Sequence, residues 1–447
     1  MKQRIVLISY SLLWWLLTPL VLARLWVKGR KQPGYRQRWA ERFGHWPTYP
    51  AECFWVHAVS VGETIAAKEL IESWLRDHPD MPILVTSMTP TGSDTVKKLF
   101  GERVRHAYLP WDFARIQRKL VKRLQPKLLV IMETELWPNL IHACHLQNVP
   151  VLVANARLSE KSKQGYLKLS ALTQPMLQEI TGIAAQHAPD AKRFTALGVD
   201  ERKIQITGSI KFDIQLDSKT ASVAKRLQTA IGKRPIWIAA STHEGEDEKI
   251  LAVHAKLKIK LPDALLILVP RHPERADKIA GTLYKQHFGF ARRSLDETPT
   301  TSQSVFLIDT LGEMMTFFEL AQAAFIGNTL NGGGGHNPIE PAALATPVLM
   351  GPSFFNFQSI VEAMRSEQAV IIIHDEEELR NRLLGVLQSK DLRDTYGQRA
   401  YLFFQQQQGA LKRLTTWIED LLSVEKSQQS NPLLFRRKPM NENQRLP

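Results

Sequence analysis

The chain has 447 residues, a formal net charge of +14, 44% hydrophobic and 23% charged residues, and two cysteines. A chain of this length is too long for one ordinary hydrophobic core and predicts two domains of about 150 to 200 residues. Its composition is that of a globular protein. Cys53 and Cys144 exclude a disulfide framework and a zinc motif, and so few cysteines fit a reducing compartment.

The N-terminal fifty residues hold nine basic residues against Glu41 alone, which is more than half of the excess charge. Within them, residues 5–23 form an uncharged stretch of nineteen residues, close to the roughly 20 that span a bilayer. A cleaved signal peptide would need a small-residue cleavage site, and a soluble core helix would rarely precede so dense a basic cluster. We predict a membrane anchor over residues 1–50 that spans the membrane or lies in its interface. The basic flank that follows predicts a cytoplasmic location for the rest of the chain and attraction to an anionic leaflet.

Beyond residue 50, short apolar runs rich in β-branched residues alternate with amphipathic stretches, a pattern typical of βαβ units and a parallel sheet. The first series of expected strands is 54–61, 83–88, 104–109, 128–133, 150–155 and 182–186. The second series is 236–240, 265–269, 305–308, 324–327, 348–350 and 369–373. We therefore predict an α/β protein with two Rossmann-like domains facing each other across a cleft. Their expected limits are 51–207 and 235–426, with a linker over 208–234 and a disordered polar tail over 427–447.

Several cofactor classes lose support because their motifs are missing from the sequence. Neither half carries a Walker loop or a G-x-G-x-x-G fingerprint, which disfavours nicotinamide, flavin and ATP-hydrolysing functions. The run 243–246 lacks the second histidine of H-E-x-x-H, and no carboxylates have metal-ligand spacing. We expect no metal, no cofactor and no nucleic-acid partner.

Glu63 closes the run His-Ala-Val-Ser-Val-Gly-Glu after the first expected strand and before a helix. Open α/β sheets bind their ligands at the carboxyl ends of strands, so Glu63 is a candidate catalytic base. The alternative is a helix-start glutamate, which the helix dipole favours.

Three loops follow strands of the second series. The first, 270–273, places Arg271 where arginine suits phosphate or base recognition, although it could instead cap a neighbouring helix. In the second, 309–313, Thr310 and Glu313 have capping-box spacing, so free N–H groups could receive a phosphate. The third, 327–340, has four consecutive glycines before Pro338, which suits a helix start, and Glu340, which could bind both ribose hydroxyls. A flexible loop would not explain the sequence His-Asn-Pro-Ile-Glu.

A basic amphipathic helix is expected over residues 112–127. Its basic residues are Arg115, Arg118, Lys119, Lys122, Arg123 and Lys127. They form either a surface for a phosphorylated ligand or a solvated face.

With these motifs in order, the chain resembles the 3-deoxy-D-manno-octulosonic acid (Kdo) transferases of lipopolysaccharide synthesis, membrane-associated GT-B glycosyltransferases that use CMP-Kdo. The resemblance runs from the anchor to about residue 420. Besides the loops above, its motifs are Leu-Trp-Val-Lys-Gly-Arg at 25–30, Met-Thr-Pro-Thr-Gly-Ser at 88–93, Met-Glu-Thr-Glu-Leu-Trp-Pro-Asn at 132–139, Ala-Asn-Ala-Arg at 154–157, Thr-Gly-Ser-Ile-Lys-Phe-Asp at 207–213 and Ser-Thr-His-Glu-Gly-Glu at 241–246.

The resemblance implies roles for individual residues. Glu63 would be the proton acceptor for the acceptor hydroxyl, and Glu133 and Lys211 would stabilise the transition state; otherwise they would be a buried ion-pair member and a linker lysine. The residues implied to bind CMP are Pro270, Arg271, Leu311, Gly312, Glu313, Asn337, Pro338, Ile339 and Glu340. The implied reaction inverts the anomeric carbon, moves Kdo to a lipid A precursor and releases CMP at the cytoplasmic side of a bacterial inner membrane.

The chain departs from the family pattern at residues 328–329, where relatives often have Gly-Ser, and at 332–335, where extra glycines lengthen the loop. Two other functions stay open. One is a hydrolysing sugar-nucleotide epimerase, which shares the two-domain architecture but does not need an anchor. The other is a non-catalytic membrane protein that binds lipid during assembly.

Overall fold

The computed structural model describes residues 2–214 and 218–430. By its contacts the chain divides into two compact units. Unit 1 comprises the described residues up to Ile210 together with those from Gly409 onward, and unit 2 comprises those from Lys211 to Gln408.

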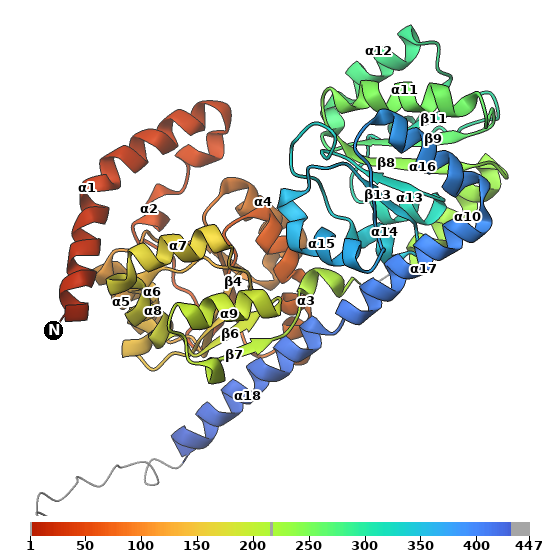
Figure 1. Ribbon diagram of the computed structural model, residues 1–447. Coiled ribbons are helices and arrows are strands. Elements are labelled where there is room, and N and C mark those ends of the chain that lie inside the picture. The colour runs from red at the N-terminus through yellow and green to blue at the C-terminus, as the bar shows by residue number, and fades with distance from the viewer. Residues whose placement is uncertain (1, 215–217, 431–447) are drawn as a thin grey trace, which may run out of the picture. The chain divides into compact units, whose positions relative to one another are not determined.

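Unit 1 is built on a parallel sheet of seven strands in the order β3-β2-β1-β4-β5-β6-β7. Strands β4, β6 and β7 are labelled in Figure 1. The strands are β1 Phe54–His57, β2 Ile83–Ser87, β3 Arg105–Tyr108, β4 Leu128–Met132, β5 Val151–Ala156, β6 Gly182–Ala185 and β7 Ile204–Ile206. The helices are α1 Lys2–Lys31, α2 Trp39–Arg42, α3 Val61–Asp77, α4 Pro90–Phe100, α5 Ala114–Leu124, α6 Pro138–Leu146, α7 Glu160–Lys168, α8 Ser170–Glu179, α9 Ala188–Ala196 and α18 Ala410–Ser430. Every residue of β1, β2, β4, β5 and β6 is buried, as expected for strands covered by helices on both faces.

Unit 2 contains a second parallel seven-stranded sheet, in the order β10-β11-β9-β8-β12-β13-β14. Its strands are β8 Ile236–Thr242, β9 Leu265–Pro270, β10 Phe290–Arg292, β11 Val305–Leu307, β12 Ala324–Ile326, β13 Val348–Met350 and β14 Ile371–Ile372. Its helices are α10 Ser218–Ile231, α11 Glu246–Lys258, α12 Ala276–Lys285, α13 Met314–Leu320, α14 Ile339–Ala343, α15 Gln358–Ser366, α16 Glu376–Gln388 and α17 Lys390–Gln407. The predicted α/β class with two Rossmann-like domains is confirmed.

All twelve expected strands are present, and the structure contains two more, β7 and β10. β7 and β10 are three-residue strands at sheet edges, and both contain residues that are not buried. Their short and partly polar sequences carry no continuous apolar run.

The domain limits differ from those expected at both points where the chain passes from one unit to the other. The stretch 208–234 is not a separate linker in the described residues, because α10 packs on α13 and contributes Ala224, Leu227 and Ile231 to the unit 2 core. Unit 2 ends at Gln408 and not at residue 426. Of the predicted tail, residues 427–430 continue α18 and the rest lies outside the described residues.

The C-terminal helix α18 returns to unit 1 and completes its core. Ala410, Leu414 and Ile418 are fully buried beside strands β1, β4 and β5. Gly182 in β6 leaves room for Trp417, since a Cβ atom at Gly182 would lie 2.6 Å from the indole ring. Unit 2 is therefore inserted between the body of unit 1 and its last helix.

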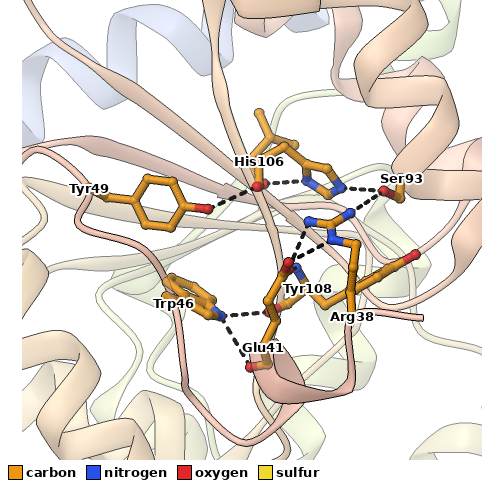
Figure 2. Close-up of polar contacts among 8 residues, drawn as sticks. Arg38, Glu41, Trp46, Tyr49, Ser93, His106 and Tyr108 are labelled. Atoms are coloured by element: carbon orange, nitrogen blue, oxygen red, sulfur yellow. Dashed lines mark hydrogen bonds and ion pairs between the residues drawn. The ribbon is translucent and has the colours of Figure 1, made fainter. Parts of the chain in front are cut away.

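A polar network ties the segment after α1 to the edge strand β3 (Figure 2). Arg38 pairs with Glu41 at 2.6 Å and donates to the Ser93 hydroxyl at 2.8 Å, and Glu41 accepts the Tyr108 backbone N–H at 2.8 Å. His106 shares that Ser93 hydroxyl at 2.7 Å, and burial lowers the pKa of His106 to about 4, which keeps it neutral.

Two aromatic side chains complete this attachment. The indole N–H of Trp46 donates to the Tyr108 carbonyl at 3.0 Å, and the Tyr49 hydroxyl donates to the His106 carbonyl at 3.1 Å (Figure 2). Arg42 is also buried and donates to the Met88 carbonyl at 3.0 Å. Arg38 and Arg42 therefore bond within unit 1, although the sequence analysis counted both in the basic cluster expected to attract a membrane.

Candidate functional site

The candidate residues of unit 1 lie at its topological switch point. The chain leaves β1 in one direction across the sheet and reaches β4 on the other side, so the loops after these two strands separate at the carboxyl edge. Open α/β sheets bind ligands in this position. Glu63 lies in the first turn of α3 after β1, and Glu133 follows β4 directly.

Glu63 is a buried carboxylate, 7% exposed, held by two donors of its own loop. Its Oε2 accepts the Val59 backbone N–H at 2.8 Å and its Oε1 accepts the Ser60 hydroxyl at 2.8 Å. Burial raises the pKa of Glu63 to about 7; the two hydrogen bonds oppose the shift, and the charges of Glu135 and Glu133 add to it. Glu63 thus occupies a helix start, as the alternative supposed, and also has the near-neutral pKa that suits a general base.

Glu135 is the third carboxylate of this cluster, and no role was predicted for it from the sequence. It is half-buried, and burial followed by the charge of Glu133 raises its pKa. Glu133 itself has a left-handed backbone with a φ of 57°, which is uncommon outside glycine and occurs more often at functional sites. The sequence Glu-Thr-Glu at 133–135 could have predicted this cluster, because it places a second carboxylate at the same edge of the sheet.

The loop that holds Glu63 is fixed from behind by the Met88–Ser93 motif. The Val59 carbonyl accepts the backbone N–H groups of Met88 at 3.1 Å and Thr89 at 3.3 Å, and the Thr89 hydroxyl at 3.2 Å. Gly92 lies against the same carbonyl, since a Cβ there would come within 3.2 Å of it. Residues with no reactive group thus set the position of the Val59 N–H and of the carboxylate it binds.

The candidate residues of unit 2 lie in the loops at the carboxyl edge of its own sheet. β8 and β12 flank the switch point of this sheet. Glu246 joins the loops that follow them: its fully buried carboxylate accepts the backbone N–H groups of Asn328 at 2.6 Å, Thr329 and Leu330 at 3.2 Å each, and His243 at 3.3 Å. These bonds fix the start of the glycine-rich loop, a role that the sequence analysis did not assign.

Two histidine side chains from the loops of this edge contact each other. His243 and His336 stack with ring centroids 5.1 Å apart, and their Nε2 atoms are 2.9 Å apart. Burial, followed by the charges of Arg271 and the neighbouring histidines, lowers the pKa of His336 to about 4. Only one proton can lie between the two nitrogens, so one ring donates this hydrogen bond and the other accepts it.

The residues implied to bind CMP come from three loops of this edge. Pro270 ends β9 and Arg271 follows it as an exposed side chain. Asn337 donates to the Glu340 carboxylate at 3.1 Å and accepts the Ile339 N–H at 3.1 Å. Pro338 occupies the N-cap position directly before α14 and makes no side-chain capping bond. Burial raises the pKa of Glu340.

The loop 309–313 differs from its expected form. α13 begins at Met314 with Glu313, and not Thr310, at the N-cap. The Thr310 hydroxyl donates to the Glu313 carboxylate, which also pairs with Arg293 at 2.8 Å. Leu311 is 70% exposed, and Gly312 has a φ of 90°. The capping box therefore does not form, and Arg293 brings a cation that the sequence analysis did not consider.

Lys211 begins unit 2, in a short 3-10 turn over Ile210–Phe212. Glu63 and Glu133 lie together in unit 1, whereas Lys211 and the implied CMP residues belong to unit 2. Among the described parts of the chain, no three His, Cys, Asp or Glu side chains are grouped so that they could hold a metal ion.

Comparison with known proteins identifies the family. The profile of the 3-deoxy-D-manno-octulosonic-acid transferases (kdotransferases) matches residues 37–214. A 3-deoxy-D-manno-octulosonic acid transferase of Haemophilus influenzae is 41% identical over 92% of this chain and 98% of its own length. A solved C-terminal CMP-Kdo binding domain from Acinetobacter baumannii is 31% identical over 42% of this chain and all of its own, with a TM-score of 0.41.

One further comparison concerns the fold alone. UDP-GlcNAc 2-epimerase of Neisseria meningitidis covers 82% of this chain and all of its own at a TM-score of 0.57, with 12% identity. The epimerase similarity thus extends to the architecture, whereas the sequence similarity to the transferase covers both units. The chain belongs to the 3-deoxy-D-manno-octulosonic acid transferase family and is a glycosyltransferase of lipopolysaccharide synthesis.

Proposed function

We propose that this enzyme moves Kdo from CMP-Kdo to a hydroxyl of a lipid A precursor at the cytoplasmic side of the inner membrane, with inversion at the anomeric carbon. The observation that supports this most directly is the carboxylate of Glu63. It is buried, has a pKa of about 7, and lies at the switch-point edge of unit 1. A group that is half deprotonated near neutral pH can both accept a proton during attack and lose it afterwards.

In the proposed reaction the acceptor oxygen attacks the anomeric carbon of Kdo and its proton passes to Glu63. The bond from the anomeric carbon to the CMP phosphate breaks, and CMP leaves with the bonding electrons. Glu133 stabilises the positive charge that develops on the sugar, and the Lys211 ammonium neutralises the departing phosphate or the Kdo carboxylate. A general base of this kind contributes about 10² to 10⁴-fold.

The donor is assigned to unit 2. Arg271 has the charge for the CMP phosphate, and the Glu340 carboxylate, oriented by Asn337, is assigned to the ribose hydroxyls. Pro270, Leu311, Gly312, Glu313, Pro338 and Ile339 complete the proposed donor site. Protein cations take the place that a divalent metal has in metal-dependent transferases.

The decisive experiment measures CMP release from CMP-Kdo with and without the lipid A precursor. Release that requires the acceptor and yields a Kdo-bearing lipid supports transfer. CMP release or conversion of the donor without acceptor would favour hydrolysing epimerase-type chemistry. Binding of the lipid with no turnover would favour an assembly role.

A further inference from the structure

Helix α1 packs on the rest of unit 1 along one continuous stripe. Leu7 lines a small cavity with Pro138 and Met176, and the rings of Trp14 and Trp137 lie 6.3 Å apart. Thr18 is only 7% exposed. With Ser11, these positions recur at intervals of three and four, which places them on one face of a helix.

The stripe is fixed by polar contacts to the start of α6. Asn139 donates its side-chain N–H to the Ser11 hydroxyl at 3.1 Å. The Tyr10 hydroxyl is hydrogen-bonded to Asp112, a fully buried carboxylate that also accepts the backbone N–H groups of Asn139 at 2.8 Å and Leu140 at 2.9 Å. Lipid acyl chains offer no substitute for such bonds.

The C-terminal half of α1 packs on the turn that follows it. The Arg36 guanidinium lies 4.1 Å from the Trp26 ring centroid and donates to the Trp26 carbonyl at 3.1 Å. Gly29 is buried against Arg36, since a Cβ at Gly29 would lie 2.4 Å from that side chain. The contacts of α1 thus extend from residue 7 to residue 29 and cover nearly all of the segment long and apolar enough to cross a membrane, 5–31.

The opposite side of α1 is apolar and uncovered. Leu16 and Leu20 are 77% and 68% exposed. The other exposed apolar residues of this face are Ile5, Ile8, Leu12, Leu13, Leu17 and Val27, and the partly exposed rings of Trp15 and Trp26 lie at its margin. A patch of this extent on a protein surface marks an interaction site.

Charge beside this face indicates which partner covers it. The ring centroids of Trp15 and Phe113 are 4.5 Å apart, and Phe113 is the N-cap residue of helix α5. α5 carries five exposed cations, none of which belongs to an ion pair in the part of the chain that the structure describes: Arg115, Arg118, Lys119, Lys122 and Arg123. Three of them line a groove of about 510 Å³ with Phe43, Trp46 and Pro47. Apolar surface beside unpaired cations matches the boundary between acyl chains and anionic headgroups.

We propose that α1 lies in the plane of the membrane interface, with its stripe on unit 1 and its exposed face in the lipid, and does not span the bilayer. A spanning helix would need about 20 residues for the lipid, and no segment of that length in α1 is free of the stripe. This proposal rests on the membrane association proposed above and not on the transfer chemistry.

The side of the membrane on which the N-terminus lies provides the first test. One cysteine is added ahead of Met1, and Tyr284→Cys, 80% exposed in α12, reports the side of the catalytic units. Cys53 and Cys144 are buried, so an impermeant maleimide should label the native chain little. We expect both introduced cysteines to react in inside-out vesicles and neither in right-side-out vesicles. Labelling of the N-terminal cysteine only in right-side-out vesicles would overturn the proposal.

The second test asks whether the stripe stays docked in the membrane. Ser11→Cys with Asn139→Cys should form a disulfide under mild oxidation at least about tenfold faster than the control Leu12→Cys with Asn139→Cys, because residue 12 lies about 100° around the helix. Equal rates would show that α1 leaves unit 1 in the membrane and would contradict the proposal. Both readouts are independent of CMP-Kdo turnover, so failure of the proposed reaction would be seen separately.

Discussion

Glu63 and Glu246 occupy the same place in two different sheets, the first turn of the helix that follows the first strand. The carboxylate of Glu246 is fully hydrogen-bonded, because four backbone N–H groups donate to its two oxygens. Glu63 accepts one backbone N–H and one hydroxyl and has two other carboxylates nearby. Burial raises the pKa of both. The two carboxylates therefore differ less in burial than in the number of hydrogen-bond donors around them, and this number sets how much of each carboxylate is left to interact with another group.

Glu63→Gln should have the largest effect. The amide cannot accept the hydroxyl proton, so kcat/KM for transfer should fall by about 10² to 10⁴-fold with CMP affinity unchanged. Glu69→Gln, a half-buried position on the same helix beside Lys68, is the control and should keep full activity. Activity of Glu63→Gln equal to that of the control would remove Glu63 from the mechanism.

The same variant should change how folding stability depends on pH. Because the folded pKa of Glu63 is raised from 4.5 to about 7, its contribution is fully present below about pH 4.5 and is lost as the pH rises through about 7. The free energy of unfolding of the wild type, relative to Glu63→Gln, should therefore fall by about 3 kcal/mol between pH 4 and pH 8. Denaturant unfolding at several pH values measures this, and a flat difference would contradict the near-neutral pKa.

Glu246→Gln should act on stability and donor binding and not on the proton-transfer step. The amide N–H₂ would face backbone donors and leave them unsatisfied, at a cost of about 1 to 3 kcal/mol. We expect a lower Tm and weaker CMP binding by calorimetry, with the pH profile of kcat unchanged. Glu248→Gln, exposed in the same first turn, is the matched control. A shifted pH profile of kcat in Glu246→Gln would show that Glu246 also affects proton transfer, and would contradict the distinction between the two glutamates.

Gly92→Ala tests the support behind Glu63. The new Cβ would meet the Thr89 hydroxyl at 2.9 Å and the Val59 carbonyl at 3.2 Å, which should displace the Val59 N–H from the carboxylate. Loss of that hydrogen bond raises the pKa of Glu63, so kcat should fall at neutral pH and recover in part as the pH rises. Gly165→Ala is the control, because a Cβ at this position has no atom within 4 Å, and it should leave the pH profile of kcat unchanged. A uniform loss at every pH would indicate general misfolding instead.

Glu135→Gln should have the smallest effect. Removing this negative charge lowers the pKa of Glu63, so the acid limb of kcat/KM should move to lower pH. The shift should stay below about one pH unit, because solvent weakens the interaction between the two charges. Adding salt to the wild type should move the limb in the same direction, and a shift to higher pH would contradict the assigned sign.

The sequence predicted the positions of the candidate site loops because parallel strands and glycine-containing turns leave local signals. β1 is buried along its whole length and is followed by a small-residue turn, so Glu63 could be located at the sheet edge. Its near-neutral pKa could not be predicted, since it depends on burial beneath other elements and on carboxylates about seventy residues away. The hydrogen bonds of Glu246 to the loop at residues 328–330 could not be predicted either, because they join residues far apart in the sequence.

The failed domain limits have a similar cause. α10 is polar on one side, so its sequence resembles a linker, yet Leu227 and Ile231 belong to a core whose other members lie far along the chain. α18 is equally ambiguous, because its apolar residues fit either unit by pattern alone. Only contacts with Gly182 and the strands of unit 1 decide between them.

The return of α18 to unit 1 has a consequence for how unit 2 can be exchanged or removed. Unit 2 enters the chain after Ile210 and leaves it at Gln408, so it is a cassette within another fold. Exchanging this cassette leaves unit 1 with its own last helix and a complete core. A truncation at residue 408, in contrast, would remove Ala410, Leu414 and Ile418 and expose the interior of the unit that carries Glu63.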